Sequence, residues 1–209
     1  MAYQLMMDFE TMGKDSMTCA AVDCAVMVFD NERFLSNNPY TLNDIDLVVK
    51  LKLSVADQVK NYGCVVEEDT LKFWQQQSKE VRAHVKPTEN DLTVKEFVDK
   101  FYQLLYNNRV NYWWSRSNTF DPIILERLFK YVDRKKDKDN VLKFWQVRDT
   151  RTYIDAKFDF SLKQNGFVPI ADEKLWEQKF KLHDSAWDVL ADVLRLQAIA
   201  RAENDLPLI

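Results

Sequence analysis

The sequence predicts an α/β fold, in which a mixed five-stranded sheet with its first three strands antiparallel is flanked by helices. Two observations predict it. The first part of the chain holds three apolar or alternating segments joined by short turns, as in an antiparallel meander. Beyond them, short apolar segments alternate with longer ones in which apolar residues recur at helical spacing. Such an order is typical of a mixed sheet covered by helices.

Five segments are expected to form the strands. Ala2–Phe9 is a short and mostly apolar run, and Ala21–Phe29 is a second one that follows a turn signal. In Asp46–Leu53 apolar and polar residues alternate, which predicts a strand with one solvated face. Two later runs complete the sheet, Asn111–Ser117 and Val141–Val147.

The helical spacing starts after Ser54. The segments expected to be helical are Asp69–Gln77, Thr93–Tyr106, Pro122–Val132, Asp155–Asn165, Asp172–Lys181 and Asp184–Glu203. Asp121 is the expected N-cap of the helix that Pro122 opens, because Pro is favoured in a first turn and Asp at a cap. The charged stretch Asp133–Asn140 is expected to be a loop, with the Arg134–Lys138 run solvated.

Length and composition favour one globular domain over residues 1–209. Hydrophobic residues make up 46% and aromatic residues 13% of the chain, which excludes a disordered protein. The uncharged apolar stretches are far shorter than the roughly 20 residues of a membrane helix, and the N-terminus lacks secretory features. We therefore expect a soluble intracellular protein with no membrane contact.

The formal net charge of −4 excludes a surface that attracts nucleic acid everywhere. It does not exclude a nuclease, because carboxylates that hold divalent cations themselves lower the net charge. The odd count of three cysteines and the absence of CxxC spacing predict buried free thiols at Cys19, Cys24 and Cys64.

Two carboxylates stand together at the end of the first predicted strand. Asp8 and Glu10 are two residues apart, so an extended backbone points both side chains to the same face. Neighbouring carboxylates repel each other unless a cation neutralises them, and Mg²⁺ or Mn²⁺ prefers such oxygen ligands. The alternative is that the two acids only begin a solvated turn.

Two further acidic positions lie at predicted helix starts. Asp121 fits helix capping as well as a catalytic position. Ser185 and Asp188 fit a capping box at the start of the last helix. His183, one of two histidines in the chain, precedes this helix, so that it and Asp188 can face a common site.

Together, in this order, these motifs resemble those of the DEDDh-type 3′–5′ exonucleases of the ribonuclease H-like superfamily, and in particular the phage DexA group. The first motif is Asp8-Phe9-Glu10-Thr11, the second is Phe120-Asp121, and the third runs from His183 to Asp188. The stretches that resemble the DexA group are DFETMG, FWQQQS, SRSNTFDPIIL, FWQVRDTRT and HDSAWDVLADVL.

The resemblance implies a ribonuclease H-like sheet and an enzyme that hydrolyses single-stranded DNA or RNA from its 3′ end, releasing nucleoside monophosphates. It implies two Mg²⁺ or Mn²⁺ ions, both bridged by Asp8. Glu10 and Asp188 would hold the ion on the side of the nucleophile, and Asp121 would support the other. His183 would be the general base.

The resemblance also implies that residues after the first acids contact the terminal nucleotide. Thr11 and Met12 are the candidates there, Phe120 is a candidate for base stacking or for the core, and Arg116 and Asn118 are candidates for a phosphate contact. At least one of Trp113 and Trp114 is expected to be packed, and Trp74 is expected in the core. Arg148 and Arg151 can either approach nucleic acid or pair with Asp149 and Asp155.

Three other functions stay open at this point. One is an RNA-trimming exonuclease of the same fold, since the polymer is not readable from sequence. Another is a nucleic-acid-binding module without activity, and the third is a structural protein whose carboxylates are only caps. The sequence also leaves the oligomeric state open.

Overall fold

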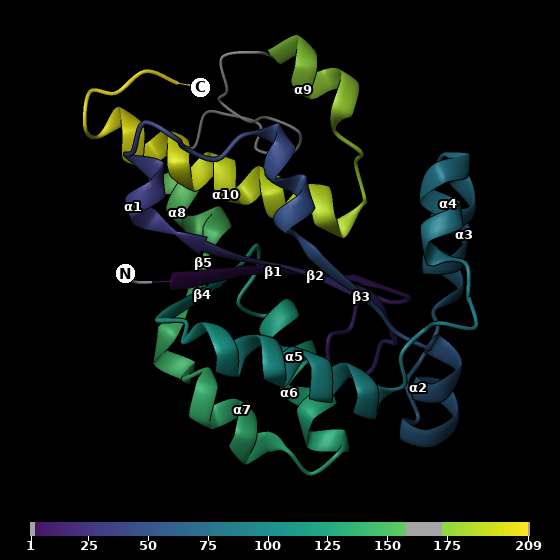
Figure 1. Cartoon of the computed structure of the whole chain (residues 1–209). Helices are drawn as coiled ribbons and strands as arrows, with labels where there is room; N and C mark the ends of the chain where they lie inside the picture. The colour runs from purple at the N-terminus through teal and green to yellow at the C-terminus, as the bar shows by residue number, and fades with distance from the viewer. Residues whose placement is uncertain (1–2, 158–172, 209) are drawn as a thin grey trace.

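The computed structural model describes residues 3–157 and 173–208. Its centre is a five-stranded sheet in the order β3-β2-β1-β4-β5 (Figure 1). The strands are β1 (Tyr3–Thr11), β2 (Ala21–Asp30), β3 (Val49–Lys52), β4 (Tyr112–Ser115) and β5 (Val147–Asp149). The pairs β1–β2 and β2–β3 are antiparallel, while β1–β4 and β4–β5 are parallel. The predicted mixed sheet, with its first three strands antiparallel, is confirmed.

Helices cover both faces of the sheet (Figure 1). On one face lie α1 (Asn31–Phe34), α8 (Thr150–Lys157), α9 (Glu173–Lys179) and α10 (Ser185–Ala202). On the other lie α5 (Val94–Asn108), α6 (Asp121–Tyr131) and α7 (Lys135–Val141). Three short helices beyond β3 form what we call the α2–α4 arm: α2 (Val55–Tyr62), α3 (Glu68–Gln76) and α4 (Lys79–Val85).

The central strand β1 divides its side chains between two cores, because successive residues of a strand point to opposite faces. Leu5, Met7 and Phe9 pack with residues of α5 and α6, whereas Met6 packs with residues of α10. Asp8 and Glu10 continue the alternation of Met6. Both carboxylates therefore emerge on the α10 face, at the end of the strand.

Two predictions around the β4–β5 connection were wrong. Most of the expected loop Asp133–Asn140 is α7, in which Lys138 is 3% exposed and pairs with Asp139 at 2.7 Å. The Arg134 guanidinium pairs with Asp137 at 2.6 Å. Ion pairs thus engage Arg134 and Lys138 at the start of α7 and within it, in a run whose composition predicted a solvated loop.

The fifth strand is also displaced. Instead of Val141–Val147 it is β5, and it is preceded by a 3₁₀ turn, η2 (Phe144–Gln146), with Phe144 and Trp145 exposed. The third strand is shorter than Asp46–Leu53, because a capping box between Thr41 and Asp44 starts the 3₁₀ helix η1 (Leu42–Leu47).

The other predicted helices are present with small shifts. Asp69–Gln77, Thr93–Tyr106, Pro122–Val132, Asp172–Lys181 and Asp184–Glu203 correspond to α3, α5, α6, α9 and α10. The helix expected at Asp155–Asn165 begins earlier, as α8, and residues 158–165 and Asp172 lie outside the described residues. All three cysteines are buried free thiols, as predicted.

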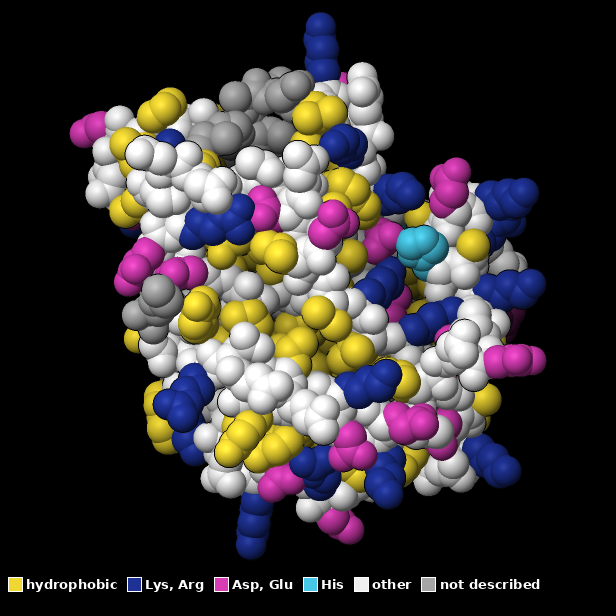
Figure 2. Space-filling view, viewed as in Figure 1, with side chains coloured by type: hydrophobic (Ala, Val, Ile, Leu, Met, Phe, Trp, Pro, Cys, Tyr) yellow, Lys and Arg dark blue, Asp and Glu magenta, His cyan; other side chains and the backbone are white. Residues whose placement is uncertain are grey.

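Among the described residues, no helix combines the length and the apolar composition that crossing a membrane requires. On the face drawn in Figure 2, Lys and Arg side chains are interspersed with Asp and Glu. This mixture agrees with the small net charge of −4. The face in view presents no continuous basic track for a polyanion.

Candidate active site

A cavity of about 790 Å³ opens where the parallel strands β1, β4 and β5 end. Asp8 and Glu10 enter it from β1, Arg116 and Ser117 follow β4, and Arg151 follows β5. The wall also includes side chains of α3 and α10, the first residue of α6 and residues of the loops that precede α6 and α10 and that follow β1. Parallel strands thus bring residues far apart in sequence to one place, as is typical of sites at the carboxyl ends of strands.

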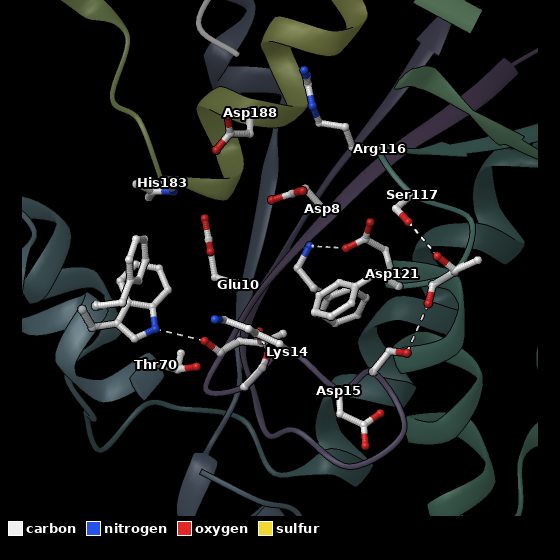
Figure 3. Close-up of a pocket in the computed structure, with 18 of the residues that line it drawn as sticks. Asp8, Glu10, Lys14, Asp15, Thr70, Arg116, Ser117, Asp121, His183 and Asp188 are labelled. Atoms are coloured by element: carbon white, nitrogen blue, oxygen red, sulfur yellow. Dashed lines mark hydrogen bonds between the residues drawn. The ribbon is translucent and has the colours of Figure 1, made fainter. Parts of the chain in front are cut away.

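Three carboxylates converge in this cavity. Asp8, Glu10 and Asp188 each present an oxygen, and these oxygens all lie within 4.8 Å of one another. Asp8 and Glu10 come from one face of β1, and Asp188 comes from the first turn of α10, which packs on that face (Figure 3). The structure therefore brings Asp188 next to two acids that precede it by 178 or more residues in the sequence.

Burial and mutual repulsion hold these acids near their protonated forms. Burial, then the charges of Asp121 and Glu10, raise the pKa of Asp8 well above its ordinary value. Burial, then Asp23 and Asp188, do the same for the pKa of Glu10. Burial and Asp192 raise the pKa of Asp188 to about 7, although Arg116 and Arg195 oppose this shift.

Asp121 lines the same cavity, outside the three-carboxylate group. It is not the N-cap that the sequence predicted, because Phe120 occupies that position without a side-chain cap bond. Instead, Asp121 Oδ1 accepts a hydrogen bond from the backbone N–H of Phe9 at 3.1 Å, next to Asp8 and Glu10 (Figure 3). Burial raises the pKa of Asp121 to about 7, and the Phe9 N–H opposes the rise.

This donor set fits a hard divalent cation. Asp8, Glu10, Asp121 and Asp188 offer only carboxylate oxygens, the ligands that Mg²⁺ and Mn²⁺ prefer. The charges that most affect the pKa of Asp8 are those of Asp121, Glu10, Asp188 and Asp192, and all four are negative. A cation bound between these carboxylates would remove their repulsion and favour the ionised forms.

His183 lies beside the acids, just before α10 (Figure 3). Its backbone is left-handed, with φ of 62°, and its ring meets the Phe73 ring almost at right angles, with 5.0 Å between centroids. Burial lowers the pKa of His183 below its ordinary value. The imidazole is therefore neutral at pH 7 and able to accept a proton.

The capping of α10 differs from the expected box. Asp184, rather than Ser185, is the N-cap, and its side chain accepts a hydrogen bond from Ala186 N. The Ser185 hydroxyl instead donates to Asp23 Oδ1 at 2.6 Å. Because Asp23 is the register partner of Glu10 on β2, this bond ties the start of α10 to the sheet beside Glu10.

Lys50 on β3 joins these two acids. Its ammonium lies 2.9 Å from Asp184 Oδ1 and 3.3 Å from Asp23 Oδ2. The other oxygen of Asp184 is 3.0 Å from His84 Nδ1, which comes from α4 of the arm. Although burial lowers the pKa of Lys50, Asp23 and Asp184 together raise it above its ordinary value. Lys50 is thus a charged bridge between the sheet and the residue that follows His183.

A second ion-pair group lies behind Asp188. Asp192, one helical turn later on α10, pairs with both Arg116 and Arg195 at 2.5 Å and accepts a hydrogen bond from Thr150 at 2.8 Å. The Arg116 side chain points toward α10 in Figure 3. These contacts hold α10 to the ends of β4 and β5.

The structure places some of the candidate substrate-binding residues in the cavity and others outside it. Thr11, Arg116 and Phe120 line the cavity, but Met12 and Asn118 are not among its lining residues. Met12 is 7% exposed and packs with Trp74 in a small core. The Asn118 backbone N–H donates to Asp149 Oδ2 at 3.0 Å.

The turn after β1 is pressed against the arm at Gly13. A Cβ atom there would lie 2.7 Å from Glu67 Oε1 and 2.8 Å from Cys19 Cβ, closer than side chains approach. Nearby, the buried Trp74 indole donates to the Thr11 carbonyl at 3.0 Å. Trp74 is in the core, as predicted, and it connects α3 to the end of β1.

Several lining residues were not identified from the sequence, among them Lys14, Thr70, Phe73 and Arg195. Phe73 lies in the FWQQQS stretch, one of those that resemble the DexA group, in which the sequence predicted a role for Trp74 alone, as a core residue. The position of the others in the cavity depends on how the arm and α10 pack, and no local pattern reveals it.

In comparisons with known proteins, this chain is similar to exonucleases. Residues 3–186 match the family described as the 3′-5′ exoribonuclease Rv2179c-like domain. The exodeoxyribonuclease of Enterobacteria phage T4 is 27% identical over 214 residues, which cover 95% of this chain and 89% of the phage protein.

Solved structures of exonuclease I have the same fold. The E. coli enzyme in complex with a dT13 oligonucleotide matches 98% of this chain with a TM-score of 0.60 at 15% identity. Exonuclease I from Methylocaldum szegediense matches 97% with a TM-score of 0.58 at 14% identity. This chain spans 43% and 41% of those two proteins, so the similarity covers less than half of each.

The carboxylate repulsion predicts an unusual effect of Asp188→Asn. The pKa of Asp188 rises from an ordinary 3.8 to about 7 on folding, so the folded state binds more protons between these pH values. Its stability therefore falls as pH rises from about 4 to about 7. The asparagine side chain carries no charge, and we expect the metal-free variant to melt a few degrees above wild type at pH 8.

The measurement is thermal unfolding by circular dichroism in EDTA at pH 5 and pH 8, repeated with Mn²⁺. The difference between variant and wild type should be smaller at pH 5, and Mn²⁺ should stabilise wild type more than the variant. A variant that melts below wild type at pH 8 in EDTA would contradict the repulsion.

Lys50→Met should destabilise the protein, because it leaves Asp23 and Asp184 buried without their cation. Removing one partner of a fully buried pair costs about 3–5 kcal/mol, and Lys50 retains 26% side-chain exposure, so we expect about 2 kcal/mol. Urea unfolding measures this loss. Lys72→Met is the matched control, because Lys72 forms an exposed pair with Glu68 and should change stability by less than about 0.5 kcal/mol. Equal effects of the two substitutions would refute the assignment.

Proposed function

Since this chain belongs to the 3′-5′ exoribonuclease Rv2179c-like domain family and is thus a nuclease that hydrolyses phosphodiester bonds, we propose that it removes nucleoside monophosphates from the 3′ end of single-stranded DNA with the help of two Mg²⁺ or Mn²⁺ ions. The observation that carries this proposal is the convergence of Asp8, Glu10 and Asp188, with His183 beside them, in one cavity. A binding module would gain nothing from such repelling anions.

The four acids would share the two ions. Asp8 lies between Glu10 and Asp188 on one side and Asp121 on the other, which supports a bridging role for its carboxylate. Glu10 and Asp188 would hold the ion on the side of the attacking water, and Asp121 would support the second. Two such ions, when bound, offset the charge that develops on the scissile phosphate and on the leaving oxygen.

His183 would act as the general base. Its lowered pKa keeps the imidazole neutral near pH 7, and the Phe73 ring restricts its orientation. Such a base takes the proton of the water that attacks the phosphorus. The left-handed backbone at His183 holds the ring at the edge of the carboxylate group, outside the first turn of α10.

The terminal nucleotide would occupy the rest of the cavity. Thr11 follows the acids of β1, and Phe120 offers a ring on which a base can stack, a contact worth roughly 1–3 kcal/mol. Arg116 is placed to approach a phosphate from the end of β4, while its NH1 pairs with Asp192. Met12 and Asn118 would not contact the nucleotide. They would only help to fix the conformation of the turn and of the loop that contain them.

DNA is favoured over RNA by the phage T4 relative, an exodeoxyribonuclease that aligns with 95% of this chain. The E. coli exonuclease I structures with dT13 and dA16 add that proteins of this fold bind single-stranded DNA. The second candidate is an exoribonuclease, which the description of the family favours. A contact with the 2′-hydroxyl would decide between them.

Digestion of 5′-labelled and 3′-labelled single strands of DNA and RNA, with Mg²⁺ and with EDTA, tests the function directly. We expect a 5′-labelled DNA strand to shorten stepwise in Mg²⁺ only, and RNA to be cut more slowly. Asp8→Ala should abolish hydrolysis at saturating Mg²⁺ while the strand still binds measurably. Cleavage in EDTA, or wild-type turnover by Asp8→Ala, would reject the two-ion assignment.

His183→Ala should reduce kcat on the order of 10²-fold, within the range of general-base catalysis. His183→Asn is a useful second variant, because Asn tolerates the left-handed backbone that Ala does not favour. Both variants should lose activity equally if the imidazole is the base. Single-turnover rates at pH 8 measure the effect, and a loss below threefold would exclude His183 as the base.

A further inference from the structure

The arginine side chains that line the cavity differ in their contacts. Arg116 and Arg195 are bound to Asp192 behind the acids. Arg151 also lines the cavity and is exposed. Within residues 3–157 and 173–208, Arg151 forms neither an ion pair nor a side-chain hydrogen bond. Its guanidinium is therefore free for a ligand.

The position of Arg151 is not explained by the stability of its helix. Arg151 lies in the first turn of α8, where the helix dipole disfavours a cation. The acid that could offset this, Asp149, is already engaged: its Oδ1 accepts from Thr152 N at 2.8 Å and its Oδ2 accepts from Asn118 N at 3.0 Å. Pairing with Asp149 or Asp155, one of the two alternatives that the sequence left open, does not occur.

Arg148, three residues earlier, has a different environment. Its guanidinium is stacked 4.3 Å from the centroid of the Tyr112 ring and donates to the carbonyls of Trp145 and Val147. Arg148 does not line the cavity. The two arginines of the VRDTR segment thus have separate roles, and only Arg151 faces the site.

We propose that Arg151 binds a backbone phosphate of the substrate strand on the 5′ side of the bond that is cut. The proposal rests on the function proposed above. A nucleotide at the 3′ end has no phosphate beyond it, so every phosphate other than the scissile one lies on the 5′ side. Near the acids such a phosphate meets repulsion, and a free guanidinium at the cavity wall offers two parallel N–H donors to its oxygens.

The test compares Arg151→Gln with Arg148→Gln, the same chemical change three residues away and outside the cavity. The substrates are a thymidine oligonucleotide and the p-nitrophenyl ester of thymidine 5′-monophosphate, which contains the scissile phosphodiester but no second phosphate. We expect Arg151→Gln to raise KM for the oligonucleotide roughly tenfold, since a hydrogen bond between charged groups is lost. Its kcat should change less than twofold, and hydrolysis of the small ester should be unchanged. Arg148→Gln should match wild type on both substrates.

Salt dependence gives a second readout. Loss of one phosphate contact should lower the slope of log affinity against log salt concentration by about 0.7 for a single strand. Equal slopes for wild type and Arg151→Gln, or equal losses on oligonucleotide and ester, would overturn the proposal.

A binding measurement separates this proposal from the function itself. Fluorescence anisotropy of a labelled thymidine oligonucleotide, with Ca²⁺ in place of Mg²⁺, reports binding without hydrolysis. Weaker binding by Arg151→Gln than by wild type supports the phosphate contact even if no substrate is cut. Equal binding refutes it, whereas a wild-type protein that binds DNA but cuts neither substrate would refute only the proposed hydrolysis.

Discussion

Electrostatic repulsion among the carboxylates of one cavity is the constraint on which the rest of the structure depends. Asp8, Glu10 and Asp188 present oxygens within 4.8 Å of one another, and Asp121 lies close enough to raise the pKa of Asp8. Such a group is unfavourable without a bound cation, so a rigid scaffold must hold the acids together. The central strand, two ion-pair groups and an N-cap on α10 supply that rigidity.

The two ion-pair groups act on opposite sides of the acids. Lys50 joins Asp23 and Asp184, so it fixes the start of α10 against the sheet beside Glu10. Asp192 joins Arg116 and Arg195, so it fixes the same helix one turn beyond Asp188. The catalytic candidates of α10 lie between these anchors. The stabilising ion pairs therefore lie around the cavity. The cavity itself contains repelling carboxylates, which a nuclease of this family can use to bind cations.

Sequence analysis could predict those features of the site that depend on the spacing of residues within one strand or helix. The period-two relation of Asp8 and Glu10, and the position of Asp188 near the start of a helix, indicated their directions. The hydrogen bond from Phe9 N–H to Asp121 spans 112 residues, so capping was a natural but wrong expectation for Asp121. The roles of Lys50 and Arg195 could not be predicted, because strand register and helix packing determine their ion-pair partners. The charged run of α7 was expected to be a loop because it has no apolar stripe. In the helix that it forms, Lys138 is buried and pairs with Asp139.

The close fit at Gly13 has a consequence for how this enzyme can vary. No side chain can be added there without displacing both Cys19 and Glu67, the residue that leads into α3. Because α3 carries the rings that adjoin His183, a change in one tight turn would be transmitted to the imidazole through the arm. The orientation of His183, the proposed general base, thus depends partly on an absent methyl group more than 160 residues earlier in the chain.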